Sequence, residues 1–366
     1  MPMLVGDKGR QTLGERVWLG WDPAHPALEQ QEALPSSITV PSAPALGPLP
    51  AVGWRCSAAD AAEALGAGAQ LLFADGDAGA ETAVAEALDT LDGDAAAAVR
   101  IVTSLEEAAC QSPEDAQAAC DAATSRLGGR PIDVLLLPPS AWGVAAGLLE
   151  AGAARSVGLI IGSAALAVPA LQEVLLAGGA QPAMLCLPLH PLVPLVQRML
   201  LGLCRRKGVR VVALEPLGGD MAEGVQAAAA AATAAAADAL QMRAEAPAVD
   251  DAEPEGGAEG GAAGGGREPP PQEWQSEATS VLLGWCVARD VIALPGSVDA
   301  RPPAELLPLS RALPPMPLAL RRALDELAPP NGTEVGFGPG KWVPPDHLKD
   351  RYEVFKGDSN WNRTEQ

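Results

Sequence analysis

The stretch I-D-V-L-L-L-P-P-S-A-W-G-V-A-A-G-L-L-E-A-G-A-A-R-S-V-G-L-I-I-G, residues 132–162, decides the fold. It begins and ends with short apolar runs, at 132–138 and 156–162, which are typical of buried strands. Between them, residues 143–153 are rich in Ala and Leu and favour a helix. A strand, a helix and a second strand in this order predict two parallel strands joined by a helix, the repeating unit of α/β folds.

The same alternation continues on both sides of this stretch. Further strands are predicted at residues 49–54, 70–75, 99–104, 183–190, 209–215 and 291–295, and further helices at 58–65, 112–127, 164–176, 192–207 and 275–289. Eight strands that alternate with helices predict an α/β fold of the (β/α)8, or TIM-barrel, type. An open doubly wound sheet is the alternative, but it requires a glycine-rich phosphate loop after an early strand, and we find none in the sequence.

Three segments lack this alternation. Residues 1–45 and 329–366 show no periodicity, so we expect an irregular N-terminal extension and an irregular C-terminal tail around a barrel at 46–328. Residues 246–272 are dense in Gly, Pro and acidic side chains, which predicts a disordered insertion within the barrel. The alanine-rich residues 221–243 before it favour a loosely packed helix.

The formal net charge of −21 argues against two classes of partner. It repels the phosphates of nucleic acids and anionic membrane surfaces. The most apolar stretch, residues 183–203, is interrupted by three prolines and Arg198, so it does not match a membrane span. The cysteines form no C-x-x-C pair, and the N-terminus resembles neither an export signal nor a transit peptide. We therefore expect reduced thiols and a cytoplasmic protein.

Five sequence blocks follow one another in an order that resembles the aldo-keto reductase superfamily. They are IDVLLL at 132–137, AARSVGLIIG at 153–162, QPAMLCLPLHP at 181–191, GVRVVALEPLG at 208–218 and LLGWCVARDVIALPGSV at 282–298. Weaker similarity at 68–81 and 99–105 extends the resemblance over roughly residues 45–325. It implies the (β/α)8 barrel of aldo-keto reductase type.

The same resemblance implies a chemistry that this chain lacks the side chains to perform. In the family, a nicotinamide delivers hydride to a carbonyl while a tyrosine donates the proton, assisted by a lysine, an aspartate and a histidine. The aspartate, tyrosine, lysine and histidine positions fall on Phe73, Ala78, Ser104 and Pro138. None of these side chains can carry out that proton transfer, so we predict no catalytic residues of the family's kind.

Shifting the alignment locally does not restore the set. Asp75 and Asp77 lie near the expected aspartate, but the single tyrosine is Tyr352, in the nonperiodic tail. No lysine occurs between Lys8 and Lys207, so the third strand cannot supply one.

The positions that the resemblance assigns to cofactor binding are also changed. Those around the nicotinamide hold Ile160, Ile161, Cys186 and Leu214, and those at the phosphate end hold Gly296 and Pro302. Ser297 stays in register and Arg301 lies one residue from an expected arginine, which leaves these two as the cofactor-binding candidates. We expect no bound cofactor, or NADPH if any.

Other chemistries find little support. Cys186 and His190 lie four residues apart and can share a metal in principle, but the sequence offers no third ligand, so we predict no metal site. No G-x-S-x-G motif is present. The sequence thus favours a catalytically inactive barrel that binds, scaffolds or regulates a protein partner, which the sequence does not name. The alternative is an NADPH-dependent oxidoreductase that reduces carbonyls with an unorthodox active site.

Overall fold

The computed structural model describes residues 34–193, 196–219, 222–245, 278–296, 299, 301–313 and 315–327. Its strands are β1 (Ser37–Thr39), β2 (Pro48–Pro50), β3 (Trp54–Arg55), β4 (Leu71–Phe73), β5 (Arg100–Ser104), β6 (Val134–Leu137), β7 (Val157–Ile160), β8 (Met184–Pro188), β9 (Arg210–Leu214) and β10 (Ile292–Leu294). Its helices are α2 (Ala61–Gly66), α3 (Ala78–Asp89), α4 (Gly93–Ala98), η3 (Glu107–Cys110), α5 (Pro113–Arg126), η4 (Pro139–Val144), α6 (Ala145–Glu150), α7 (Ala164–Ala177), α8 (Val196–Lys207), α9 (Ala222–Glu245), α10 (Ala278–Val287), α11 (Pro303–Ser310) and α12 (Leu318–Glu326), with η2 (Pro44–Leu46) between the first two strands.

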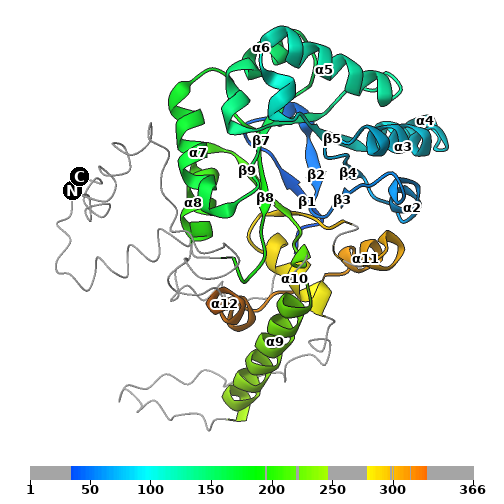
Figure 1. The fold of residues 1–366 in the computed structure, drawn as a ribbon. Helices are drawn as coiled ribbons and strands as arrows, with labels where there is room; N and C mark the ends of the chain where they lie inside the picture. The colour runs from blue at the N-terminus through cyan, green and yellow to red at the C-terminus, as the bar shows by residue number, and fades with distance from the viewer. Residues whose placement is uncertain are drawn as a thin grey trace, which may run out of the picture.

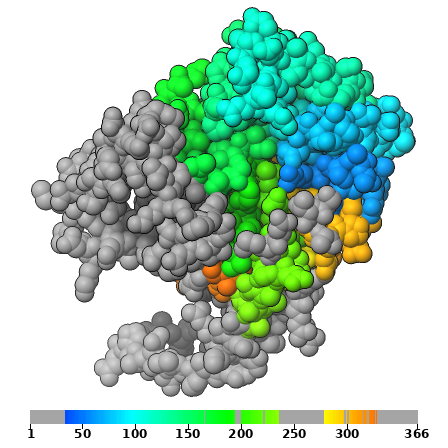
Figure 2. Space-filling model, in the orientation of Figure 1, coloured from blue at the N-terminus to red at the C-terminus, as the bar shows by residue number. Residues whose placement is uncertain are grey.

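Strands β3 to β10 form one parallel sheet in which each strand pairs with the next along the chain. Backbone hydrogen bonds also join its two edges, since the Arg55 N–H donates to the Pro295 carbonyl at 2.8 Å and the Ala293 N–H to the Ala51 carbonyl at 2.9 Å. The sheet is therefore closed into a barrel, and the predicted (β/α)8 fold is confirmed. The helices surround it in chain order, from blue α2 through cyan α5 to green α8 (Figures 1 and 2).

A short antiparallel hairpin, β1 and β2, covers the amino-terminal end of the barrel. The Ser42 hydroxyl lies 3.2 Å and 2.9 Å from the carbonyl oxygens of Pro182 and Gly208, which precede β8 and β9. This hairpin differs from the expectation of irregular chain before residue 46 and of one strand at 49–54. Each hairpin strand has only three residues, too few for a visible alternation.

The other differences between the sequence predictions and the structure mainly concern the helices. The structure adds α3, α4, α11 and α12, for which we expected none, and it divides the expected helix at 143–153 between η4 and α6. Helix α9 projects beyond the barrel (Figure 1). The predicted insertion at 246–272 and tail at 329–366 lie outside the described residues. Among the described helices, none is both long and apolar enough to span a membrane.

Candidate functional site

The register of the barrel strands decides which side chains face the interior. The Thr103 hydroxyl donates to the Glu81 carboxylate on α3 at 2.6 Å, so Thr103 points toward the helices. Since side chains alternate along a strand, Ser104 and Val102 point inward. Val102 pairs with Phe73, and Phe73 pairs with Arg55. The side chains of Phe73 and Arg55 therefore also face the interior.

The same register continues around the barrel. Ser104 pairs with Leu136, Leu136 with Gly158, Ile160 with Cys186, Val212 with Cys186, and Leu214 with Leu294. The positions that the resemblance assigns to catalysis and to the nicotinamide therefore lie together at the carboxyl ends of the strands, where TIM-barrel active sites are found. We call this end of the barrel the mouth.

The side chains at the four catalytic positions are unsuited to proton transfer. Phe73, at the aspartate position, is fully buried and fills the interior. Ala78, at the tyrosine position, is the exposed first residue of α3, and Pro138, at the histidine position, precedes η4. A Cβ atom added to Gly76 would lie 2.6 Å from the Ser104 carbonyl oxygen and 3.0 Å from its Oγ. The loop after β4 therefore passes close to Ser104, and a side chain at position 76 would collide with it.

The two aspartates near the expected catalytic position have other partners. The Asp77 carboxylate accepts the N–H of Ala80 at 2.6 Å and caps α3. The Asp75 carboxylate accepts two hydrogen bonds from Arg55, through Nε at 2.9 Å and through Nη2. Among the described residues, neither carboxylate is paired with a lysine.

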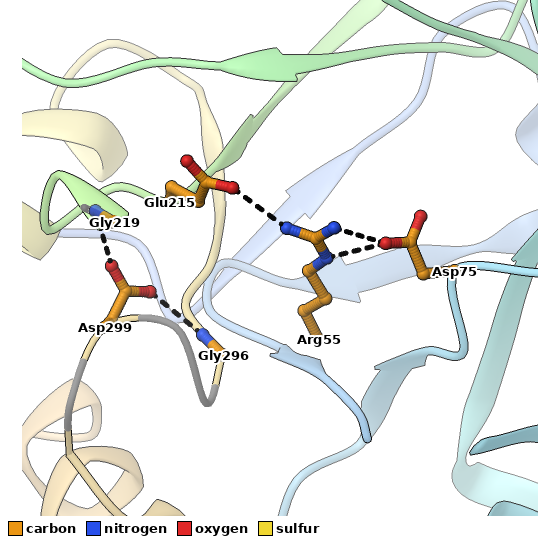
Figure 3. A network of polar contacts seen from close by, with 6 residues as sticks. All are labelled: Arg55, Asp75, Glu215, Gly219, Gly296 and Asp299. Atoms are coloured by element: carbon orange, nitrogen blue, oxygen red, sulfur yellow. Dashed lines mark hydrogen bonds and ion pairs between the residues drawn. The ribbon is translucent and has the colours of Figure 1, made fainter. Parts of the chain in front are cut away.

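Arg55 is the centre of an ion-pair network across the mouth (Figure 3). Besides Asp75, which follows β4, its guanidinium binds the Glu215 carboxylate after β9, with Nη1 3.1 Å from Oε1. Burial alone would lower the pKa of Arg55, but the two carboxylates raise it above its ordinary value. Asp75 and Glu215 both have positive φ, 52° and 55°, a conformation that costs energy for residues with a side chain. The ion pairs stabilise this strained arrangement.

A second acid, Asp299, is completely buried beside this network. Its carboxylate accepts the N–H of Gly296 at 2.9 Å and the N–H of Gly219 at 3.3 Å (Figure 3). Burial is the main cause that raises the pKa of Asp299, and the negative charge of Glu215 adds to it, whereas the two N–H groups lower it. The resulting pKa is about 6.

Sequence reasoning missed Arg55, Glu215 and Asp299 as parts of one site. The available signal was Arg55 itself, a charged residue within the apolar run A-V-G-W-R-C at 51–56. Its partners lie 20 and 160 residues away along the chain, so spacing alone cannot identify them.

The cofactor positions that the structure describes do not fit an NADPH. Ile160, Cys186 and Leu214 present aliphatic groups and a thiol whose pKa is raised by complete burial. A Cβ atom on Gly296, at the family's lysine position, would lie 2.9 Å from the Arg55 carbonyl oxygen and 3.0 Å from its Cβ, so a lysine has no room there. Arg301 is half-buried before α11, and Ser297 lies outside the described residues.

Cys186 and His190 do not come together with a third ligand. Both are buried, and burial lowers the pKa of His190 to about 4. Within the described ranges, no group of three or more His, Cys, Asp or Glu side chains is arranged to hold a metal ion.

A closed parallel barrel with a polar network at its carboxyl end defines a protein of the TIM-barrel class. The family model of the aldo/keto reductase family matches residues 51–252, more than half of the 366 residues, and the chain belongs to this family. The recognition of the superfamily from the sequence is thereby confirmed.

Solved structures are similar in fold. A crystal structure of an aldo/keto reductase from Brucella melitensis has 16% identity and a TM-score of 0.57, and the match covers 81% of this chain and 100% of that one. MGS-M4, an aldo-keto reductase enzyme from a Medee basin deep-sea metagenome library, has 14% identity and a TM-score of 0.59, covering 81% and 97%. At these identities the likeness concerns the fold alone. No curated protein gives a significant sequence match.

Proposed function

We propose that this member of the family does not reduce carbonyls, and acts instead as a binding, scaffolding or regulatory subunit for a protein partner in the cytoplasm. One observation carries the first half. The interior position of the family's aspartate holds the fully buried Phe73, and the position of its lysine holds Ser104. Without these two groups, no side chain among the described residues of the mouth lowers the pKa of a proton donor in the family's manner.

The charged groups that do lie at the mouth are poor replacements. The pKa of the Arg55 guanidinium is raised, so it keeps its proton at any physiological pH. Asp75 and Glu215 are both engaged with Arg55, which holds them as structural ion pairs. Loss of general acid catalysis alone reduces a rate by about 10²–10⁴-fold.

The proposal of a binding role rests on the barrel itself and on the negative charge of the chain. A stable barrel can serve many functions, because function depends on the site and not on the fold. The formal charge of −21 favours a partner whose contact surface is basic or mixed. We expect the acidic residues 246–272 to take part, and nucleic acids and membranes to be excluded by the same charge.

The experiment is a purification of the full chain from its native source, followed by identification of the proteins that accompany it. The proposal expects a stoichiometric protein partner that survives washing. Recovery of the chain alone from a native extract, combined with carbonyl reduction by the pure protein, would contradict it.

The family's own activity is the second candidate, because membership in an oxidoreductase family favours it directly. This candidate requires measurable NADPH binding. If calorimetry finds micromolar or tighter affinity, Arg301→Ala should weaken it.

A further inference from the structure

Two backbone N–H groups converge on one point at the edge of the mouth. The first belongs to Gly296, just after β10, and the second to Gly219, in the loop after β9. These strands are the seventh and eighth of the barrel. In TIM barrels, the loops after the seventh and eighth strands frequently form a phosphate-binding site.

In this chain the two N–H groups already hold an anion. Both donate to the carboxylate of Asp299, at 2.9 Å to Oδ2 and 3.3 Å to Oδ1, with a weaker contribution from the Leu217 N–H. The carboxylate is completely buried, so water does not share these donors from outside. Backbone N–H groups that converge in this way stabilise an oxyanion whether it belongs to a ligand or to the protein.

The local backbone is shaped for this role. Gly218 and Gly219 have φ values of 107° and 52°, and a Cβ atom on Gly219 would lie 2.6 Å from a Glu215 carboxylate oxygen. A side chain at position 219 would strain this backbone and displace the Glu215 carboxylate, so glycine suits the loop that directs its N–H toward Asp299.

We propose that this corner of the barrel is an oxyanion-binding site which the Asp299 carboxylate of the chain itself occupies, excluding phosphate groups from solution. Among the described residues, the carboxylates of Asp75 and Glu215 share the guanidinium of Arg55 beside Asp299, so the Arg55 charge is already paired with two acids. A phosphate competing with Asp299 would add to the negative charge of these acids. Removing Asp299 frees both N–H groups and takes away one negative charge.

The test is chemical rescue of Asp299→Ala by small oxyanions. The melting temperature of the variant is measured in sodium formate and in sodium phosphate, against sodium chloride of equal ionic strength. Formate replaces the lost carboxylate and phosphate probes the proposed ligand class. At an oxyanion concentration about tenfold above its dissociation constant, the folding equilibrium constant should rise about tenfold.

The controls separate this effect from a general loss of charge. The unaltered chain and Asp121→Ala, which removes an exposed carboxylate that accepts a hydrogen bond from Gln117, should respond to oxyanions no more than to chloride. If Asp299→Ala does not fold, Asp299→Ser is used, because its shorter side chain still leaves space at the N–H groups, and phosphate should shift the amide resonances of Gly219 and Gly296. Rescue of Asp299→Ala no better than in chloride would overturn the proposal, as would unshifted amides in Asp299→Ser or equal phosphate binding by the unaltered chain.

This inference concerns the mouth that the proposed function describes as inactive, but its readout is phosphate-dependent stability. Carbonyl reduction by the unaltered chain would contradict the proposed function and leave the rescue experiment unaffected. The proposed function and this inference can therefore be contradicted independently of each other.

Discussion

Nη1 of Arg55 lies 3.1 Å from Oε1 of Glu215, so that an ion pair joins the first and seventh strands of the barrel across the end of the eighth. Through Asp75 the same guanidinium also reaches the second strand. Arg55, Asp75 and Glu215 are thus bound to one another at the carboxyl end of the barrel.

We predict that Arg55→Met lowers the free energy of unfolding by about 1–3 kcal/mol, because two strained carboxylates lose their shared partner. Urea denaturation measures this change. Arg55→Lys keeps the charge but not the planar fork that binds both acids, so its loss should be smaller. A Met variant as stable as the unaltered chain would show that the network contributes nothing to the fold.

We predict that Gly296→Lys, which restores the family's lysine, destabilises the chain by about 1–3 kcal/mol and does not create NADPH binding. The new side chain must begin where the Arg55 backbone already lies. Gly147→Lys is the matched control, because a Cβ atom there meets no atom within 4 Å. Thermal unfolding and calorimetry with NADPH measure both effects, and tight NADPH binding by Gly296→Lys would show that only one residue had been lost.

The pH dependence of stability should show the titration of Asp299. Because burial raises its pKa from 3.8 to about 6, the folded chain binds a proton in this window that the unfolded chain releases. The stability that this group contributes is therefore present below pH 3.8 and is lost as pH rises through about 6. Relative to Asp299→Asn, whose amide resembles the protonated acid, the unaltered chain should lose about 2–3 kcal/mol between pH 4 and pH 7.

His190 provides the opposite slope as a control. Burial lowers its pKa from 6.5 to about 4, so its contribution to stability is present above pH 6.5 and is lost as pH falls through about 4. Relative to His190→Gln, the unaltered chain should therefore gain stability over the range in which Asp299 causes a loss. Parallel pH profiles for the unaltered chain and both variants would contradict both assignments.

Deleting residues 246–272 should leave the melting temperature nearly unchanged and weaken association with the partner that co-purifies. The deleted segment follows the far end of α9, which projects from the barrel (Figure 1), so its removal takes no barrel strand away. A deletion variant that does not fold would show that the disorder prediction is wrong. Full recovery of the partner would instead place the interface in residues 1–45 or 330–366.

The sequence predicted the barrel well because its strands are buried apolar runs. Residues such as Leu135 and Val212 form continuous hydrophobic strands that periodicity detects. The hairpin escaped prediction because its strands are too short. At the mouth, the sequence shows that Ser104 stands at the family's lysine position, but it does not show which side chains form ion pairs there. The pairing of Arg55 with Asp75 and Glu215, and the crowding of Gly296 by Arg55, depend on strand ends meeting in space, which spacing along the chain does not encode.

The most direct test of the central claim is the rate of NADPH oxidation by the purified full chain with aldehydes, ketones and quinones. Because Phe73, Ala78 and Ser104 stand at the positions that the family gives to the aspartate, the proton donor and the lysine, we predict a rate equal to that of buffer alone. Turnover in the ordinary enzyme range, about 1–10³ s⁻¹, on any of these carbonyls would contradict the claim and establish the chain as an active reductase.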